Sequence, residues 1–250
     1  MNPPVRSELI AKWERDEAAV FEGWDFSYIK DRFVEEEPGW DYRALAKGLI
    51  KKSAAVLDVA TGGGEVFSSL APFPVRAIAV EGYRPNVTVA RKRLEPLGVQ
   101  VLEGGETPLP FAGNTFDLVL NRHGGFDAAE IYRVLQEKGT FLTQQVDGGN
   151  LIELLDLFDA KQKWPDHVLK NVRQRMQNFG FHIERAEEWK GKARFLDVAR
   201  TDLQKREGWE KRWDVDSLKS EDLAKELRLF CEEVIEHLAS EPRIQETVLV

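Results

Sequence analysis

The sequence predicts an α/β protein built on a mostly parallel sheet. Between residues 54 and 146, short apolar segments of strand length alternate with segments that have a helical pattern. A run of three glycines separates the first apolar segment from the first helical one. The chain has 250 residues, of which 42% are hydrophobic, and this is enough for the core of one large domain. Such alternation is typical of parallel strands joined by right-handed crossovers.

The first strand and its turn lie in "AAVLDVATGGGEVFSSLA", residues 54–71. Ala54–Ala60 is apolar apart from one acid, as expected of a strand buried on both faces. Thr61–Gly64 cannot extend a strand, but it can form a sharp turn through positive φ. Glu65–Leu70 then resumes with residues that suit a helix. A strand, a glycine turn and a helix start can together direct free backbone N–H groups at a ligand.

The next segments continue the alternation. Proline near the start and glycine after the end delimit one helix, and an Asp-x-x-Glu start with a glycine stop delimits another. The predicted elements are the strands Val75–Gly82, Val99–Gly105, Asn114–His123 and Thr140–Val146, and the helices Pro85–Gly98 and Asp127–Gly139.

The last hundred residues are less regular. The spacing of apolar residues predicts helices at Asp166–Phe179 and Ser220–Leu238. Strands are expected at Phe181–Trp189 and at Arg243–Val250. We therefore expect one domain over residues 51–250, with a helical insertion at about 195–240.

Residues 1–50 are expected to form a separate N-terminal helical cap. The tripeptide GWD occurs twice in this region. Asp25 and Asp41 suit N-cap positions, and Trp24 and Trp40 can each pack against the first turns of the helix that follows. The alternative is that the two tryptophans line a ligand site.

Charge and cysteine content exclude several classes of protein. The net charge of −8 argues against a nucleic-acid partner, because such proteins need a basic face. Cys231 is the only cysteine, which excludes an intramolecular disulfide and a cysteine-rich metal site, and no histidine–carboxylate spacing indicates a metal. No apolar run is long enough to span a bilayer, and the N-terminus is too charged for a signal peptide. We expect a cytoplasmic protein without a membrane partner.

Three classes of ligand compete for the glycine turn. A nucleoside-triphosphate loop needs a lysine directly after the glycines, and none follows here. The dinucleotide fingerprint, counted from Gly62, needs a third glycine where this chain has Phe67. The third class fits better, since Asp58-x-x-x-Gly62-x-Gly64 resembles the first motif of class I S-adenosylmethionine-dependent methyltransferases.

Further segments carry the same resemblance, which covers roughly residues 50–150 and is closest to the type 11 methyltransferases. "LPFAGNTFDLVLNRH", residues 109–123, is similar to the family segment LPF-x-x-x-x-FD-x-V. "EIYRVLQEKGTFLTQQV", residues 130–146, is similar to the family's E-x-x-R-V-L-K-P-G-G helix and following strand, although Gln136–Lys138 replaces lysine-proline-glycine. The resemblance implies a Rossmann-like three-layer sandwich with a mostly parallel seven-stranded sheet. It also implies S-adenosyl-L-methionine as the cofactor, bound at the carboxyl ends of the strands.

The resemblance assigns roles to individual residues. Asp58 would orient the glycine turn and the amino end of the cofactor's methionine, and Glu81 would accept hydrogen bonds from the ribose hydroxyls. Glu106 stands beside Gly105, near the position where the family often has an acid that contacts the adenine. The expected cofactor-binding residues are Asp58, Ala60, Thr61, Gly62, Gly64, Glu81, Gly82, Tyr83, Glu106, Asn121 and Arg122.

The residues at the end of the fourth predicted strand would line the passage to the methyl acceptor. His123 is the candidate catalytic base there, for an acceptor that arrives protonated. The alternative is that His123 only orients the strand end. Gln144 and Gln145 are unusual at the end of a buried strand, and we expect one to face the pocket and the other the neighbouring strands.

The function expected is methyl transfer from S-adenosylmethionine to a small-molecule acceptor by in-line displacement. Two alternatives stay open. One is a methyltransferase that acts on RNA or another macromolecule, and the other is a non-catalytic domain that binds S-adenosylmethionine, because a fold does not imply an activity.

Overall fold

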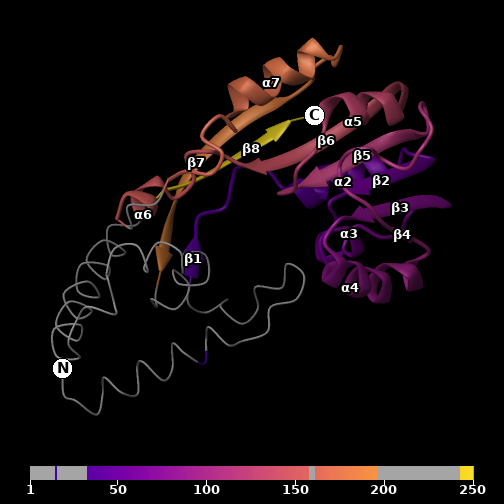
Figure 1. The fold of residues 1–250 in the computed structure, drawn as a ribbon, viewed down its shortest axis with the longest axis horizontal. Helices are drawn as coiled ribbons and strands as arrows, with labels where there is room; N and C mark the ends of the chain where they lie inside the picture. Colours follow the sequence, from indigo (N-terminus) through magenta and orange to yellow (C-terminus); the bar gives the residue numbers. More distant parts are fainter. Residues whose placement is uncertain (1–14, 16–32, 158–160, 196–242, 250) are drawn as a thin grey trace.

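The computed structural model describes residue 15 and residues 33–157, 161–195 and 243–249 (Figure 1). The strands are β1 Phe33–Glu35, β2 Ala55–Val59, β3 Arg76–Glu81, β4 Gln100–Glu103, β5 Phe116–Arg122, β6 Leu135–Val146, β7 Ala186–Phe195 and β8 Arg243–Leu249. The helices are α2 Tyr42–Ile50, α3 Glu65–Ser68, α4 Arg84–Leu94, α5 Ala128–Val134, α6 Ile152–Leu157 and α7 Leu169–Asn178, with a 3₁₀ turn, η2, at Glu95–Leu97.

The described strands form one sheet in the order β1-β7-β8-β6-β5-β2-β3-β4. The five strands from β4 to β6 pair in parallel, which confirms the predicted α/β fold with a mostly parallel sheet. Strand β8 pairs antiparallel with both β6 and β7, and β1 pairs antiparallel with β7. The described sheet thus has eight strands where seven were expected, because the short β1 lies in a region for which the sequence indicated only helices.

Helices cover both faces of the sheet, which gives three layers. Figure 1 shows α5 and α7 on one side of the sheet and α3 and α4 on the other. Alternate residues of β2 point to opposite faces, so Val56 joins the core with α2 and α4, whereas Leu57 joins the core with α5 and α7. All five residues of β2 are buried, as expected of a central parallel strand.

Two predicted boundaries near the parallel sheet are wrong: the end of α5, and the start of the next strand, which is Leu135 and not Thr140. The helix predicted to run to Gly139 ends at Val134, because Leu135 turns extended and enters the core. The amides of Asn114 and Thr115 then bond the carbonyls that α5 leaves unpaired, at 3.0 and 2.8 Å. Lys138 completes the reversal in the left-handed conformation, with φ 63°.

Other boundaries shift in the last hundred residues. Strand β7 starts at Ala186 and not at Phe181, and α7 starts at Leu169 and not at Asp166. Helix α6 was not predicted. The expected helix at Ser220–Leu238, the rest of the insertion and the first GWD helix lie outside the described residues.

The second GWD sequence starts a helix as predicted. Asp41 is the N-cap of α2, and its Oδ1 accepts a hydrogen bond from the amide of Ala44 at 3.1 Å. Trp40 and Tyr42 are buried, with 8% and 5% of their surface exposed, and both belong to the core on the α2 face. The start of α2 is therefore fixed to the sheet by two aromatic side chains.

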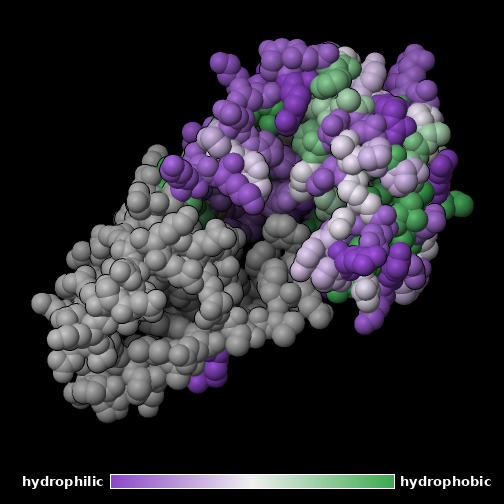
Figure 2. Space-filling model, in the orientation of Figure 1, coloured by the Kyte–Doolittle hydropathy of each residue, from purple (hydrophilic) through white to green (hydrophobic). Residues whose placement is uncertain are grey.

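The described surface is largely hydrophilic on the face drawn in Figure 2. Apolar side chains such as Val75 and Trp164 are exposed at separate places in the chain. Among the described helices, none has the length and apolar character needed to cross a membrane.

The glycine turn after β2 is closed by helix α4. Gly64 is the N-cap of α3 with φ 78°, and a Cβ added there would lie 2.8 Å from Cγ of Leu94, at the end of α4. Arg93 donates to the carbonyl of Gly63 and to the carboxylate of Glu65, which holds α4 against the turn. The last glycine of the turn is thus needed for packing inside the protein.

We predict that Gly64→Ala destabilises the fold more than Gly98→Ala does. Gly98 has a similar φ of 81°, but nothing lies within 4 Å of an added Cβ there. Left-handed strain alone costs on the order of 1–2 kcal/mol, and overpacking against Leu94 adds roughly 1–3 kcal/mol. Urea denaturation of both variants measures the difference, and equal losses would show that the contact with Leu94 relaxes freely.

Candidate cofactor site at the carboxyl edge of the sheet

The glycine turn lies at the carboxyl edge of the sheet and bends through left-handed residues. Ala60, Gly62 and Gly64 have φ values of 57°, 62° and 78°. A left-handed alanine is strained, and such strain is typical of functional sites. The amide of Thr61 donates to the Val80 carbonyl at 3.1 Å, and the amide of Gly64 donates to the Thr61 carbonyl at 3.1 Å.

The carboxylate of Glu81 ties the turn to the end of β3. Its Oε2 accepts from the amide of Gly62 at 2.7 Å, and its Oε1 accepts from the amide of Tyr83 at 2.8 Å. Glu81 is 7% exposed, so the two backbone amides hold a buried charge in place. The amides of Thr61, Gly62 and Gly64 are thus used inside the protein, contrary to the expectation of a turn with free N–H groups.

Asp58 is the second buried carboxyl at this edge. It is the next-to-last residue of β2, with 8% of its surface exposed, and burial raises its pKa from an ordinary 3.8 to about 7. The Thr61 hydroxyl lowers that pKa, and the charge of Glu81 raises it. The Thr61 oxygen itself is buried and makes no hydrogen bond of normal geometry within the described residues.

Tyr42 brings α2 to the same edge. Its hydroxyl donates to the carbonyl of Asn121 at 3.4 Å, and the guanidinium carbon of Arg122 lies 5.9 Å from the centre of its ring. Burial raises the pKa of Tyr42 well above its ordinary value, and the charge of Asp58 raises it further, so the phenol stays protonated. Only the place of Tyr42 after the Asp41 cap could have indicated this role from the sequence.

Asn121 clamps the ends of three strands together. Its side-chain nitrogen donates to the carbonyl of Val59 at 2.9 Å, and its Oδ1 accepts from Thr143 at 3.1 Å and from Gln145 at 2.5 Å. Asn121 is fully buried. Its side chain is thus occupied by contacts within the sheet.

Gln144 and Gln145 point to opposite faces of the sheet, and Gln145 contacts a neighbouring strand as predicted. Gln145 points at Asn121 and Thr143 on the α5 side, where its Nε2 lies 2.6 Å from the Thr143 hydroxyl. Gln144 points the other way, and its Oε1 accepts from the indole nitrogen of Trp40 at 3.0 Å. Its Nε2 lies 3.4 Å from Nε2 of His123.

The remaining expected residues lie at the rim. Tyr83 is 64% exposed beside Gly82, at the end of β3. A Cβ added to Gly125 would lie 2.8 Å from Oε1 of Glu106, so Glu106 reaches from the end of β4 to the loop after β5. Gly124 packs in the same loop against the side chain of Ala60. The structure therefore gathers the expected residues along one edge of the sheet.

Of the other histidines, His167 lies beside the residues that follow β6, because its carbonyl accepts from the amide of Gly148 at 2.8 Å. His182 is exposed, and His237 lies outside the described residues. Burial lowers the pKa of His167, the charge of Arg175 lowers it further, and Asp147 raises it. No cluster of three or more His, Cys, Asp or Glu side chains suits a metal ion in the part of the chain that the structure describes.

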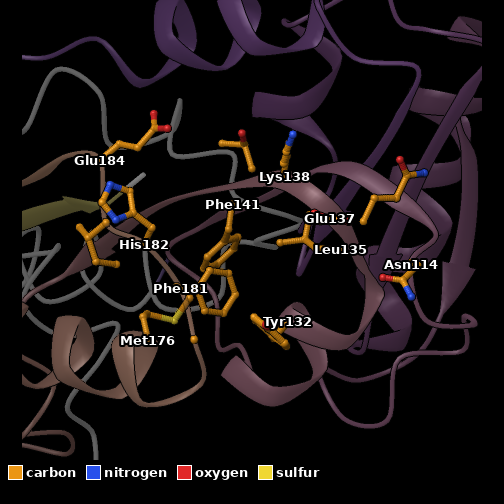
Figure 3. A pocket seen from close by; sticks show the side chains of 15 residues that line it. Asn114, Tyr132, Leu135, Glu137, Lys138, Phe141, Met176, Phe181, His182 and Glu184 are labelled. Carbon is orange, nitrogen blue, oxygen red and sulfur yellow. The ribbon is translucent and has the colours of Figure 1, made fainter.

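A hollow of about 510 Å³ lies at the opposite edge of the sheet, where β5 and β6 begin. Figure 3 shows Tyr132, Phe141, Met176 and Phe181 gathered along it. The ring centres of Tyr132 and Phe181 are 5.3 Å apart, so these rings pack against each other and close the core. The hollow is remote from the glycine turn, and we do not assign it to the cofactor.

Comparison with known families decides the class of the site. Residues 57–143 match the type 11 family described as a methyltransferase domain. The chain carries a class I methyltransferase domain. The family uses S-adenosylmethionine as methyl donor, and the matched segment runs from β2 to β6 through the glycine turn and Glu81. Comparison with curated proteins gives no match.

Solved structures share the fold of this methyltransferase at low identity. A protein from Bacillus halodurans, provisionally described as a methyltransferase, is 20% identical with a TM-score of 0.55, covering 82% of this chain and 97% of its own. A functionally unknown protein from Deinococcus radiodurans is 15% identical with a TM-score of 0.56, covering 87% and 89%. The [4+2]-cyclase SpnF is 14% identical with a TM-score of 0.51, covering 96% and 92%.

We predict that Asp58→Asn stabilises the methyltransferase at alkaline pH. The folded pKa of about 7 exceeds the ordinary 3.8, so the folded state binds more protons than the unfolded state between these values. The free energy of unfolding of the parent therefore falls as pH rises from about 4 to 7. Above pH 7 the variant gains up to about 4 kcal/mol, at about 1.4 kcal/mol per pKa unit.

Urea denaturation at pH 5 and pH 8 measures this effect. Asp41→Asn is the matched control, because Asp41 is exposed and asparagine also caps a helix. A parent whose stability rises between pH 5 and pH 8, with no gain from Asp58→Asn, would contradict the assignment of a destabilising buried carboxyl.

Proposed function

We propose that the chain transfers a methyl group from S-adenosylmethionine to a small molecule. One observation carries the proposal: two buried carboxyl groups, Asp58 and Glu81, flank a left-handed turn at the carboxyl edge of a parallel sheet. Ligands of open α/β sheets bind at this edge, next to the point where the strand order reverses. In this sheet the order reverses between β2 and β5, directly beside the turn.

The residues present fit the cofactor that the family uses. S-adenosylmethionine carries an ammonium and a sulfonium, and when bound it supplies a methyl group already activated for displacement. Asp58 and Glu81 place negative charge at the edge, and the buried Thr61 oxygen offers a further polar contact. Each oxygen of Glu81 accepts one amide and retains a lone pair for a ribose hydroxyl.

The chain's own contribution is to hold the reactants in line and keep water out. We assign Ala60, Gly62, Gly64, Gly82 and Tyr83 to the cofactor beside the two carboxyl groups, and Glu106 and Arg122 to the rim of its site. His123 follows β5 directly and is the side chain that we assign to the acceptor. Positioning of this kind accounts for much of the rate of a displacement whose leaving group is already activated.

A small acceptor is favoured over a macromolecule by charge and by the N-terminal segment. The net charge of −8 opposes the phosphate backbone of RNA. Trp40 and Tyr42 bring the start of α2 to the ends of β5 and β6, which supports residues 1–50 as a cap over the acceptor. We propose that residues 1–50 form this cap and that residues 51–250 form the methyltransferase domain. We also propose a cytoplasmic location, which the single cysteine supports.

Turnover of methyl-labelled S-adenosylmethionine tests the function. We expect label to move into small molecules of a metabolite extract and not into added RNA. The same assay with Gly62→Val serves as the blank, because a branched side chain opposes the φ of 62°. Label that appears in RNA alone would support the macromolecular alternative, and cofactor binding without transfer to either would support a non-catalytic domain.

We predict that Glu81→Gln weakens binding of S-adenosylhomocysteine by about 1.5–3 kcal/mol, the range for hydrogen bonds to a charged group. Glu103→Gln is the matched control. Glu103 pairs with Glu81 in the register of β3 and β4, but its side chain is 45% exposed and pairs with Arg84 at 2.8 Å. Calorimetry that gives both variants the parental affinity would remove Glu81 from the cofactor site.

A further inference from the structure

A chain of two polar contacts joins α2 to His123. Trp40 donates to Oε1 of Gln144 at 3.0 Å, and Nε2 of Gln144 lies 3.4 Å from Nε2 of His123. The contact between Trp40 and Gln144 is buried. Trp40, Gln144 and His123 lie 104 and 21 positions apart in sequence, so only the fold brings them together.

The indole fixes the orientation of the Gln144 amide. An indole N–H can only donate, so the group that faces Trp40 must be the amide oxygen. The amide nitrogen then faces His123. This assignment rests on the chemistry of tryptophan and not on the similar shapes of the two ends of an amide.

The amide in turn fixes the proton on the imidazole. An amide nitrogen can only donate, so Nε2 of His123 must accept and carries no proton. In neutral imidazole the proton then sits on Nδ1. The same residue also holds the backbone, because the amide of His123 donates to the Gln144 carbonyl at 2.9 Å.

The backbone of His123 supports a functional reason for this arrangement. His123 has φ 54°, a left-handed conformation that is costly for a residue with a side chain. It directly follows Arg122, which pairs with Gln144 in the register of β5 and β6. A strained residue whose backbone and ring both contact one neighbour is held in a defined position.

We infer that Gln144 is a positioning residue that holds His123 as the Nδ1–H tautomer, with Trp40 fixing Gln144. In this state Nδ1 is a hydrogen-bond donor, and the lone pair of Nε2 is committed to Gln144. His123 therefore offers no lone pair with which to act as the base expected from the sequence. Resting on the proposed function, this favours acceptors whose nucleophilic lone pair is available without loss of a proton.

Nitrogen-15 NMR of the full chain labelled in histidine tests the inference without a ligand. At alkaline pH we expect Nε2 of His123 to give a pyridine-type signal and Nδ1 a protonated one, with the peak assigned by its loss in His123→Asn. Gln144→Glu replaces the donor with a carboxylate that accepts from Nε2–H, and it should shift the tautomer ratio at least tenfold toward Nε2–H. Trp40→Phe removes the indole donor, so the Gln144 amide can rotate and present its oxygen to His123. This variant should shift the tautomer ratio in the same direction, at least threefold.

Trp189→Phe is the matched control, because it removes an indole N–H from a residue packed against the same core cluster. It should leave the ratio unchanged. The inference is overturned if the parent carries the proton on Nε2. It is also overturned if neither Gln144→Glu nor Trp40→Phe changes the tautomer ratio. A shift in Gln144→Glu alone retains Gln144 and removes Trp40. If Gln144→Glu does not fold, the result for Trp40→Phe decides alone. Failure of the unmodified protein to bind S-adenosylhomocysteine would count against the proposed function only.

Discussion

The carboxylate of Glu81 is the contact on which the edge of the sheet depends. It spans from the end of β3 to the turn after β2, and it bonds the backbone amides of Gly62 and Tyr83. A turn of three glycines has little conformational preference of its own, so it needs a partner that selects one conformation. Because that partner is a buried charge, loss of its two donors would be costly, and the turn and the strand end are fixed together.

A second buried carboxyl near Glu81 places two like charges at the same edge of the sheet. Asp58 is buried close enough to Glu81 for the two charges to oppose each other, and its pKa of about 7 reflects mainly burial and partly that repulsion. Removing two like charges from water costs free energy. A cationic ligand reverses the balance, so the features that destabilise the free protein are the ones that favour binding. A loss of stability in the free protein that favours binding is common where function requires a strained site.

Much of this edge could be predicted from local sequence, because strands, turns and caps depend on neighbouring residues. The alternation from Ala54 to Val146 gave the five parallel strands, and Asp41 gave the start of α2. The contacts between Trp40, Gln144 and His123 could not be predicted, because they join positions that only the tertiary fold brings together. The end of α5 was missed for a related reason: helix propensity continues to Lys138, but burial of Leu135 in the core overrides it.

Proteins that share this fold can differ in the reaction that they support. A [4+2]-cyclase shares the fold at a TM-score of 0.51, and a fold does not by itself select a reaction. In this chain the polar side chains at the ends of β5 and β6 divide by face. On the α5 side, Asn121, Thr143 and Gln145 bond one another and close the sheet. On the α2 side, Gln144 and Arg122 meet Trp40 and Tyr42, which come from outside the segment shared with the family. We therefore propose that selection of the acceptor belongs to the α2 side, where Trp40 and Tyr42, outside the matched segment, contact the ends of β5 and β6.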